Sequence, residues 1–356
     1  MKLRKIKKKN LIIIIAAAIL LIGGIITSVI LLTGKDTKEN KEEEPKEEKT
    51  NEPTVQVVDL NSTSRPYAVM INNIGAARPY HTGLQDAYLV YEMVVEGGIT
   101  RYLALFRDKT NEVVGNVRSA RHYYIDYVLE NDAYYVHWGW SPQAQSDIST
   151  LDIDNLNGLT YSSPYFFRQK ISGVNTEHTA FTNLSELANL VDRLGYRKET
   201  NKDLLLDYSA TSVELPSDAT DAINIDLKYS SSSTTNYVYD SEAKVYKQYV
   251  NNKEHTDYET KEQYTVKNII TYQVGNTTIT GDDKGRQDLD NIGSGTGYFI
   301  TEGKSIPITW EKDSRSSQTV YRYEDGTEIT VNDGNTWIHI IPKSGNISIS
   351  WNICIK

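Results

Sequence analysis

The fold is decided by residues 88–106, which read YLVYEMVVEGGITRYLALF. Two apolar runs, Tyr88–Val95 and Thr100–Phe106, lie on either side of Glu96-Gly97-Gly98. Two strand-like runs joined across glycines are typical of a β-hairpin. We therefore predict a hairpin here, with its turn at the glycine pair.

Apolar runs alternate with helix-like segments around this hairpin, from residue 65 to about residue 197. The strand-like segments are 66–72 and 133–140, and the segments with helical spacing are 119–131 and 183–194. The second helix is amphipathic and has Asn183 or Ser185 available as its cap. The mixture predicts an N-terminal mixed α/β layered domain, residues 55–197.

The composition changes at about Ala222. From there, short segments rich in Val, Ile, Thr and Tyr are separated by Gly, Asn and Asp turns. This pattern predicts a mostly antiparallel all-β domain, residues 222–356, built as a sandwich or a curled sheet. Residues 198–221 are the predicted interdomain linker. The predicted fold class of the whole body is α+β.

An apolar run of 22 residues, 11–32, follows a basic flank, residues 1–10, that holds six Lys or Arg and no acid. As a helix this run would be about 33 Å long, enough to cross a bilayer. It exceeds the apolar region of a cleaved signal peptide, which is the competing interpretation. We therefore predict a single-pass anchor in the cell membrane with a cytoplasmic N-terminus and an extracytoplasmic body.

Residues 33–54 are rich in charge and nearly free of apolar side chains, so they predict a disordered charged linker. The chain carries a net charge of −9. Because its first 54 residues hold 11 basic and 8 acidic side chains, the remaining body has a net charge of −12. An acidic body argues against a nucleic-acid partner.

Other classes of site lack their sequence signatures. The one cysteine, Cys354, excludes intrachain disulfides, a Cys-based zinc site and a lipid-modified cysteine after the apolar run. The six histidines are not paired at metal-ligand spacing, so we expect no metal site. We find no phosphate-binding glycine loop, HExxH or serine-hydrolase elbow, and we predict no cofactor.

The densest polar cluster lies between residues 72 and 147, and no single member can be assigned a catalytic role. We interpret its members as candidate ligand-binding residues: Asn72, Arg78, Glu92, Glu96, Arg101, Arg118, Ser119, Arg121, His137 and Asp147. His137 between Val136 and Trp138 is either a packed core histidine or an acid/base group at a strand end. Ser141 before Pro142 predicts a helix start, with Asp147 on that helix.

The most informative part of this cluster is Val117-Arg-Ser-Ala-Arg121. If Ser119 caps a helix, then Arg121 lies in its first turn beside Arg118. Helix N-termini are already electropositive, so a cation there is unfavourable by about 0.3–1 kcal/mol. Something anionic must offset the pair. It is either a protein carboxylate or a bound anion such as phosphate.

Several of these motifs resemble the YerB family, whose members are two-domain extracytoplasmic proteins of Gram-positive bacteria, named as lipoproteins and containing a domain of unknown function. The motifs are RPYAVMIN at 65–72, VEGGITR at 95–101, VRSAR at 117–121, HWGWSP at 137–142, KNII at 267–270 and GNTW at 334–337. The resemblance spans about Arg65 to Pro342. It implies an extracytoplasmic location and no particular reaction. One departure is that an apolar helix stands where the family has its lipid-modified cysteine.

Two functions are consistent with the sequence, beside a purely structural spacer at the surface that would have no concave pocket near Arg121. The first is a non-enzymatic surface module that binds an anionic cell-envelope ligand or a partner protein through Arg101, Arg118 and Arg121. The second is a cell-wall-polymer hydrolase or phosphotransferase, in which the same arginines hold phosphate and a carboxylate or histidine supplies the acid or base. The positions of the three guanidinium groups distinguish an open site from an internal network.

Overall fold

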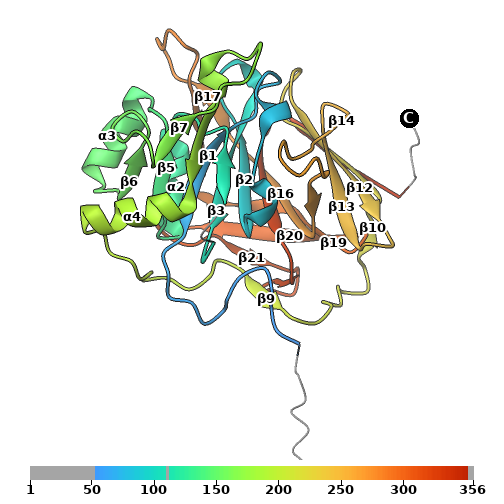
Figure 1. Ribbon diagram of the computed structural model, residues 1–356. Coiled ribbons are helices and arrows are strands. Elements are labelled where there is room, and N and C mark those ends of the chain that lie inside the picture. The colour runs from blue at the N-terminus through green and yellow to red at the C-terminus, as the bar shows by residue number, and fades with distance from the viewer. Residues whose placement is uncertain (1–52, 110–111, 352–356) are drawn as a thin grey trace, which may run out of the picture. The chain divides into compact units, whose positions relative to one another are not determined.

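The computed structural model describes residues 53–109 and 112–351 (Figure 1). The predicted basic flank 1–10, the transmembrane helix 11–32 and all but the last two residues of the linker 33–54 lie outside the described residues. Within the described ranges, no helix is both long and apolar enough to cross a bilayer. The described residues group into one compact unit.

The core of this unit is an 11-stranded mixed sheet. Its strands follow the order β10-β20-β19-β16-β23-β2-β3-β1-β5-β6, and β21 pairs with β20. Their bounds are β1 Tyr67–Asn72, β2 Leu89–Val94, β3 Thr100–Phe106, β5 Tyr134–His137, β6 Asn155–Asn157, β10 Thr220–Asp221, β16 Asn268–Val274, β19 Gly293–Thr301, β20 Lys304–Lys312, β21 Val320–Arg322 and β23 Thr336–Pro342. The predicted hairpin is confirmed as β2 and β3, joined through the 3-10 turn η3 (Glu96–Gly98).

The two halves of the chain meet inside this sheet, where β2 runs parallel to β23. Leu89 is in register with Thr336, and Glu92 with His339. Every residue of both strands is buried, since each strand has a paired neighbour on both sides and is covered on both faces. Figure 1 shows β1, β2 and β3 beside β16, β19 and β20, which come from the other end of the chain.

The predicted fold class, a layered α/β domain followed by an all-β domain, is wrong. The described residues are mostly β, and their three α-helices are short: α2 Ile125–Glu130, α3 Pro142–Thr150 and α4 Leu184–Leu194. The sequence pattern was misleading because strands buried on both faces read as continuous apolar runs, whatever segment they pair with. Periodicity gives an element's type and not its partner, so β23 could not be matched to β2.

A second sheet covers part of the first and has the order β14-β13-β12-β11-β24, with β15 on β13. Its bounds are β11 Asn224–Lys228, β12 Thr234–Asp240, β13 Val245–Val250, β14 Lys253–Glu254, β15 Thr265–Val266 and β24 Asn346–Ser350. Smaller sheets pair β17 (Asn276–Thr278) with β18 (Gln287–Leu289), β9 (Asp207–Ser209) with β22 (Thr330–Asn332), and β8 (Ala180–Asn183) with β4 (Val113–Gly115) and β7 (Phe166–Arg168).

Two of the predicted helices begin as their caps indicate. The Ser141 hydroxyl accepts a hydrogen bond from the Ala144 amide at 3.1 Å at the start of α3. The Asn183 side chain accepts one from the Ser185 amide at 2.9 Å at the start of α4. These side chains satisfy amide groups that have no partner within the helix. Both cap predictions are confirmed, with Asn183 rather than Ser185 as the cap of α4.

Candidate functional site

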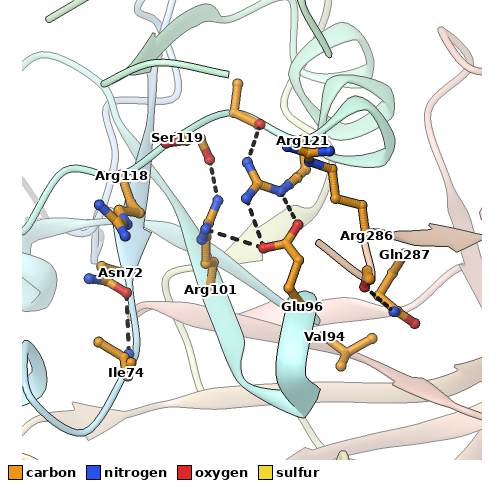
Figure 2. A network of polar contacts seen from close by, with 12 residues as sticks. Asn72, Ile74, Val94, Glu96, Arg101, Arg118, Ser119, Arg121, Arg286 and Gln287 are labelled. Carbon is orange, nitrogen blue, oxygen red and sulfur yellow. Dashed lines mark hydrogen bonds and ion pairs between the residues drawn. The ribbon is translucent and has the colours of Figure 1, made fainter. Parts of the chain in front are cut away.

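The arginine cluster is organised around Glu96, in the turn between β2 and β3 (Figure 2). The Arg121 guanidinium donates to both carboxylate oxygens of Glu96, with the Nη2–Oε2 contact at 2.7 Å. Arg101 Nη2 lies 3.5 Å from the same carboxylate, and its Nη1 donates to the Ser119 carbonyl at 2.5 Å. Two guanidinium groups therefore share one carboxylate.

Both arginines are almost fully buried, with Arg101 4% and Arg121 8% exposed. Burial, together with the neighbouring charge of Arg121, lowers the pKa of Arg101 to about 10. Burial alone would also lower the pKa of Arg121, but its hydrogen bond to Glu96 and the charge of that carboxylate raise it. Burial disfavours the ionised form of Glu96, yet the two arginines lower its pKa overall. The network is ionised and carries one excess positive charge.

Arg118 does not join this network. Its guanidinium pairs with Glu177 at 2.8 Å, and the two side chains are 28% and 48% exposed. Figure 2 shows Arg118 beside Asn72, turned away from Glu96. The Asn72 amide nitrogen lies 3.2 Å from Nδ1 of His178. The three predicted arginines thus divide into a buried pair and one separate surface ion pair.

The predicted helix start at Ser119 is wrong. The Ser119 hydroxyl donates to the Trp138 carbonyl at 3.0 Å and caps nothing. The backbone stays extended through Arg121, the 3-10 turn η4 spans His122–Tyr124, and α2 begins only at Ile125. Because Arg121 precedes the first turn and turns back to Glu96, the cation is offset by a protein carboxylate. That was the internal-network alternative for this residue.

The other candidates lie at separate places. His137 is fully buried, with Nδ1 2.8 Å from the Gly139 carbonyl and Nε2 3.3 Å from the Asn155 side-chain oxygen. Burial lowers its pKa to about 4. Asp147 pairs with Arg315 at 2.8 Å. The packed-core interpretation of His137 agrees with this geometry, and neither residue contacts the Glu96 network.

Arg78 lies at a third position, in the 3-10 turn η1 (Arg78–Tyr80). Its Nε donates to the Asn73 side-chain oxygen and its Nη2 to the Asn73 carbonyl, both at 2.9 Å. These bonds hold the guanidinium against the end of β1. Asn73 also donates to Glu92, at 3.3 Å. Arg78 therefore connects to the Glu92 side of the sheet and not to the Glu96 network.

Glu92 belongs to a second polar network, at the junction of β2 and β23. It is 1% exposed and accepts a hydrogen bond from the Thr235 hydroxyl at 2.8 Å. His339 Nδ1 lies 3.2 Å from its carboxylate. The His339 ring is in turn held between the hydroxyls of Tyr229, at 2.8 Å, and Tyr237, at 2.9 Å. Every polar contact of this network is internal, and it ties the second sheet to the first.

A pocket of about 620 Å³ lies directly against the Glu96 turn. Both chain neighbours of Glu96 line it, and so do both chain neighbours of Arg286. Figure 2 shows Arg286 and Gln287 beside Glu96 and Arg121. The walls combine polar and apolar groups with one cation: Gly97, Gly98, Lys228, Ser230, Asn276, Gln287 and Ser344 lie beside Val94, Val95 and Pro342. Glu96, Arg101 and Arg121 do not themselves line the pocket, and the arginine pair is connected to it through the β2–β3 turn that carries Glu96.

Most of these pocket residues were missed by sequence reasoning. They come from the second half of the chain, in the loop after β11 and in the β17–β18 hairpin, far in sequence from Glu96. The one local signal is the serine run 230–233. There the Ser230 hydroxyl donates to the Gly98 carbonyl at 2.6 Å and so closes the pocket on one side. Within the described residues, no group of three or more His, Cys, Asp or Glu could hold a metal ion.

Two family models match this chain, described as the N-terminal and C-terminal domains of a protein of unknown function, DUF3048. They match residues 50–197 and 225–338. The chain belongs to the DUF3048 family. One DUF3048 relative is named "Putative lipoprotein YerB" and comes from Bacillus subtilis (strain 168). It is 32% identical over 289 residues, which are 80% of this chain and 84% of the relative.

The likeness extends to a solved structure. The crystal structure of the YerB protein from Bacillus subtilis has a TM-score of 0.69 and 30% sequence identity to this chain. It covers 80% of this chain, and the match takes in 94% of that structure. The resemblance deduced from short motifs is therefore confirmed, and with it the kinship of this DUF3048 chain to a protein of unknown function.

Proposed function

We propose that this chain is a membrane-anchored extracytoplasmic binding protein, and that it holds a polar, anionic cell-envelope ligand in the pocket beside Gly97 and Gly98. The anchoring part of the proposal rests on the basic and apolar N-terminal residues 1–32 and on the lipoprotein name of the Bacillus relative. The location implied is the outer side of the cell membrane.

The ligand proposal rests on the excess positive charge of the Arg101–Arg121–Glu96 network, next to the turn that lines the pocket. Arg101 and Arg121 share Glu96, so a positive charge remains within a region of low dielectric constant, where it is weakly screened. Lys228 adds an exposed ammonium group at the pocket wall. Ser231 and Ser344 add neutral polar side chains to the lining. The side-chain amides of Asn276 and Gln287 also lie there, but they already donate to neighbouring protein oxygens and so shape the wall. A phosphate or carboxylate on a hydroxyl-rich polymer matches this combination.

A binding role is better supported than the hydrolase or phosphotransferase alternative. The acid/base candidates Glu92 and His137 are buried elsewhere, and their polar atoms are engaged by protein groups. Glu96 lies beside the pocket but is held ionised by two arginines. An ionised carboxylate in such a network is a poor proton acceptor. None of these groups is placed to exchange a proton with a guest in the pocket.

Titration calorimetry on residues 53–356 tests this function, with glycerol phosphate oligomers as the anionic probe and uncharged glucose oligomers of similar length as the comparison. We expect binding of the phosphate oligomer that weakens as the salt concentration rises. Lys228→Gln is expected to weaken it about three- to tenfold. The matched control is Lys253→Gln on β14, an exposed lysine of the same sheet outside the pocket.

Three results would contradict the proposal. One is no heat of binding for the phosphate oligomer at low salt. Another is an equal loss of affinity in the Lys228 and Lys253 variants, because a pocket ligand should respond only to the first. Preferential binding of the uncharged oligomer would also count against an anionic ligand.

A further inference from the structure

The second sheet ends in a strand with one open side. β24 pairs with β11 in the antiparallel register Asn224 with Ser350 through Lys228 with Asn346. It is the last strand in the sheet order, and no other strand of the described residues pairs with its second side. The open side presents backbone amide and carbonyl groups that a further strand can pair with.

Among the residues that the structure describes, this edge shows no usual protection against pairing. Residues 346–351 read NISISW and contain no charged residue and no proline, although charged residues make up 24% of the chain. Edge strands in monomeric proteins are commonly blocked by lysine, proline, a bulge or a covering loop.

A hollow of about 550 Å³ runs along the same edge. It is lined by three consecutive residues of β24, Ile347, Ser348 and Ile349. Side chains of consecutive strand residues point to opposite faces, so a space that touches all three lies at the strand's edge. Two large aromatic side chains flank it, Tyr298 at 38% and Trp351 at 70% exposure.

We propose that β24 pairs antiparallel with β24 of a second copy of this chain, with the two-fold axis at Ser348. In that register Ile347 lies opposite Ile349 of the second copy, and Ser348 lies opposite Ser348. The isoleucines already pack partly against the core, so their apolar face continues across the interface while the serine stays on the exposed face. Cross-strand pairs of β-branched residues stabilise such a contact.

The sequence favours a second copy over an unrelated strand. The pattern Ile-Ser-Ile reads the same in both directions about Ser348, so an antiparallel copy places isoleucine opposite isoleucine and serine opposite serine on each side of the two-fold axis. The strand also has no charge with which to select an oppositely charged partner. The occupant that matches both features is the same strand.

Charge substitution at Ser348 tests the pairing. Sedimentation of residues 53–356 over a wide concentration range should show a monomer–dimer equilibrium. Ser348→Lys and Ser348→Glu, each alone, place like charges opposite one another and should weaken the dimer at least about tenfold. The glutamate variant should form the weaker dimer of the two. Asp226 lies opposite Ser348 within the same molecule, so it adds further negative charge beside the new carboxylate. An equimolar mixture of the two variants should dimerise again.

Ser241→Lys is the matched control, since Ser241 is exposed in the turn between β12 and β13 and away from β24. It should dimerise like the unmodified chain. Thermal unfolding checks that each variant folds. Hydrogen exchange in the unmodified chain gives a readout that needs no variant. Amides 346–350 should exchange more slowly at high protein concentration.

Four results would overturn the proposal, three of them from sedimentation. These three are a monomer at every concentration, a Ser348→Lys variant that dimerises like Ser241→Lys, and a mixture of the two charged variants that stays monomeric. The last would show that the strands do not meet at Ser348. The fourth is hydrogen exchange of amides 346–350 at a rate that does not depend on protein concentration.

Discussion

Glu96 is the side chain on which the arginine cluster depends. It is separated from Arg121 by 25 positions along the chain, and it reaches both Arg101 and Arg121 because the β2–β3 turn brings it to the end of the neighbouring strand. A buried ion network tolerates loss of a partner poorly, since the remaining charge stays desolvated. Two buried guanidinium groups make this position especially sensitive.

We therefore expect Glu96→Gln to lower the free energy of unfolding by about 3 kcal/mol, measured by urea denaturation at pH 7. The contribution of Glu96 is present above its ordinary pKa of 4.5 and is lost as the pH falls through the lowered folded value. The control is Glu177→Gln, which breaks the exposed pair with Arg118 and should cost less than about 1 kcal/mol. Equal costs for the two variants would mean that Glu96 is not a buried counter-ion.

His137 gives a prediction about pH. Burial lowers its folded pKa from 6.5 to about 4, so the unfolded chain binds a proton more readily between these values. Stability attributable to this neutral ring is complete above pH 6.5 and is lost as the pH falls toward 4. In urea denaturation from pH 7 to pH 4.5, His137→Asn should therefore show a shallower loss of stability than the unmodified chain. An unchanged slope would contradict a buried neutral His137.

Single residues were predictable where the partner is local. Ser141 and Asn183 cap helices a few positions ahead, so their roles followed from the sequence. Ser119 has the same chemistry but donates to Trp138, on an adjacent segment, and its cap prediction failed. Glu96 was recognised as a candidate, but its choice of two arginines depends on strand pairing that local spacing does not encode.

The β2–β3 turn is the element that joins the arginine network to the pocket. Gly97 and Gly98 both have φ near +70°, a region that disfavours any side chain. They differ in their surroundings. A Cβ at Gly98 would lie 2.9 Å from the Ser230 hydroxyl oxygen, whereas nothing lies within 4 Å of one at Gly97.

Gly97→Ala is accordingly expected to cost about 1 kcal/mol of unfolding free energy, from the backbone alone. Gly98→Ala should cost about 1 kcal/mol more, because the new methyl group meets Ser230. Adding Ser230→Gly to each variant should recover stability only with Gly98→Ala, a coupling that a double-mutant cycle in urea measures. Equal losses of unfolding free energy in the two glycine variants would show that Ser230 does not pack tightly against the turn.

Elements were predicted best where they are contiguous. The β2–β3 hairpin and α4 were found from spacing and caps, since both are closed by neighbouring residues. The pocket wall opposite the turn was not found, because its β17–β18 hairpin approaches from the other half of the chain. Nothing in the turn-rich sequence of that hairpin indicates which surface it faces.

At the scale of the molecule, the parallel pairing of β2 with β23 makes one sheet out of both halves. The Glu92–His339 contact crosses the same boundary, so neither half can keep its core without the other. We expect residues 53–356 to unfold in a single cooperative transition. In the unmodified chain, tryptophan fluorescence and far-ultraviolet circular dichroism should give the same urea midpoint. Two well-separated midpoints would contradict a shared core.

The position of β23 in the sheet also delays completion of the sheet during synthesis. A ribosome makes β2 early, but β23, which pairs with the edge of β2 that β3 leaves free, begins only at Thr336. At roughly 5–20 residues per second, the nascent hairpin waits roughly 10–50 s with one edge bare. Throughout that interval the free edge of β2 can pair with a wrong strand. The correct pairing forms only after β23, near the end of the chain, has been synthesised.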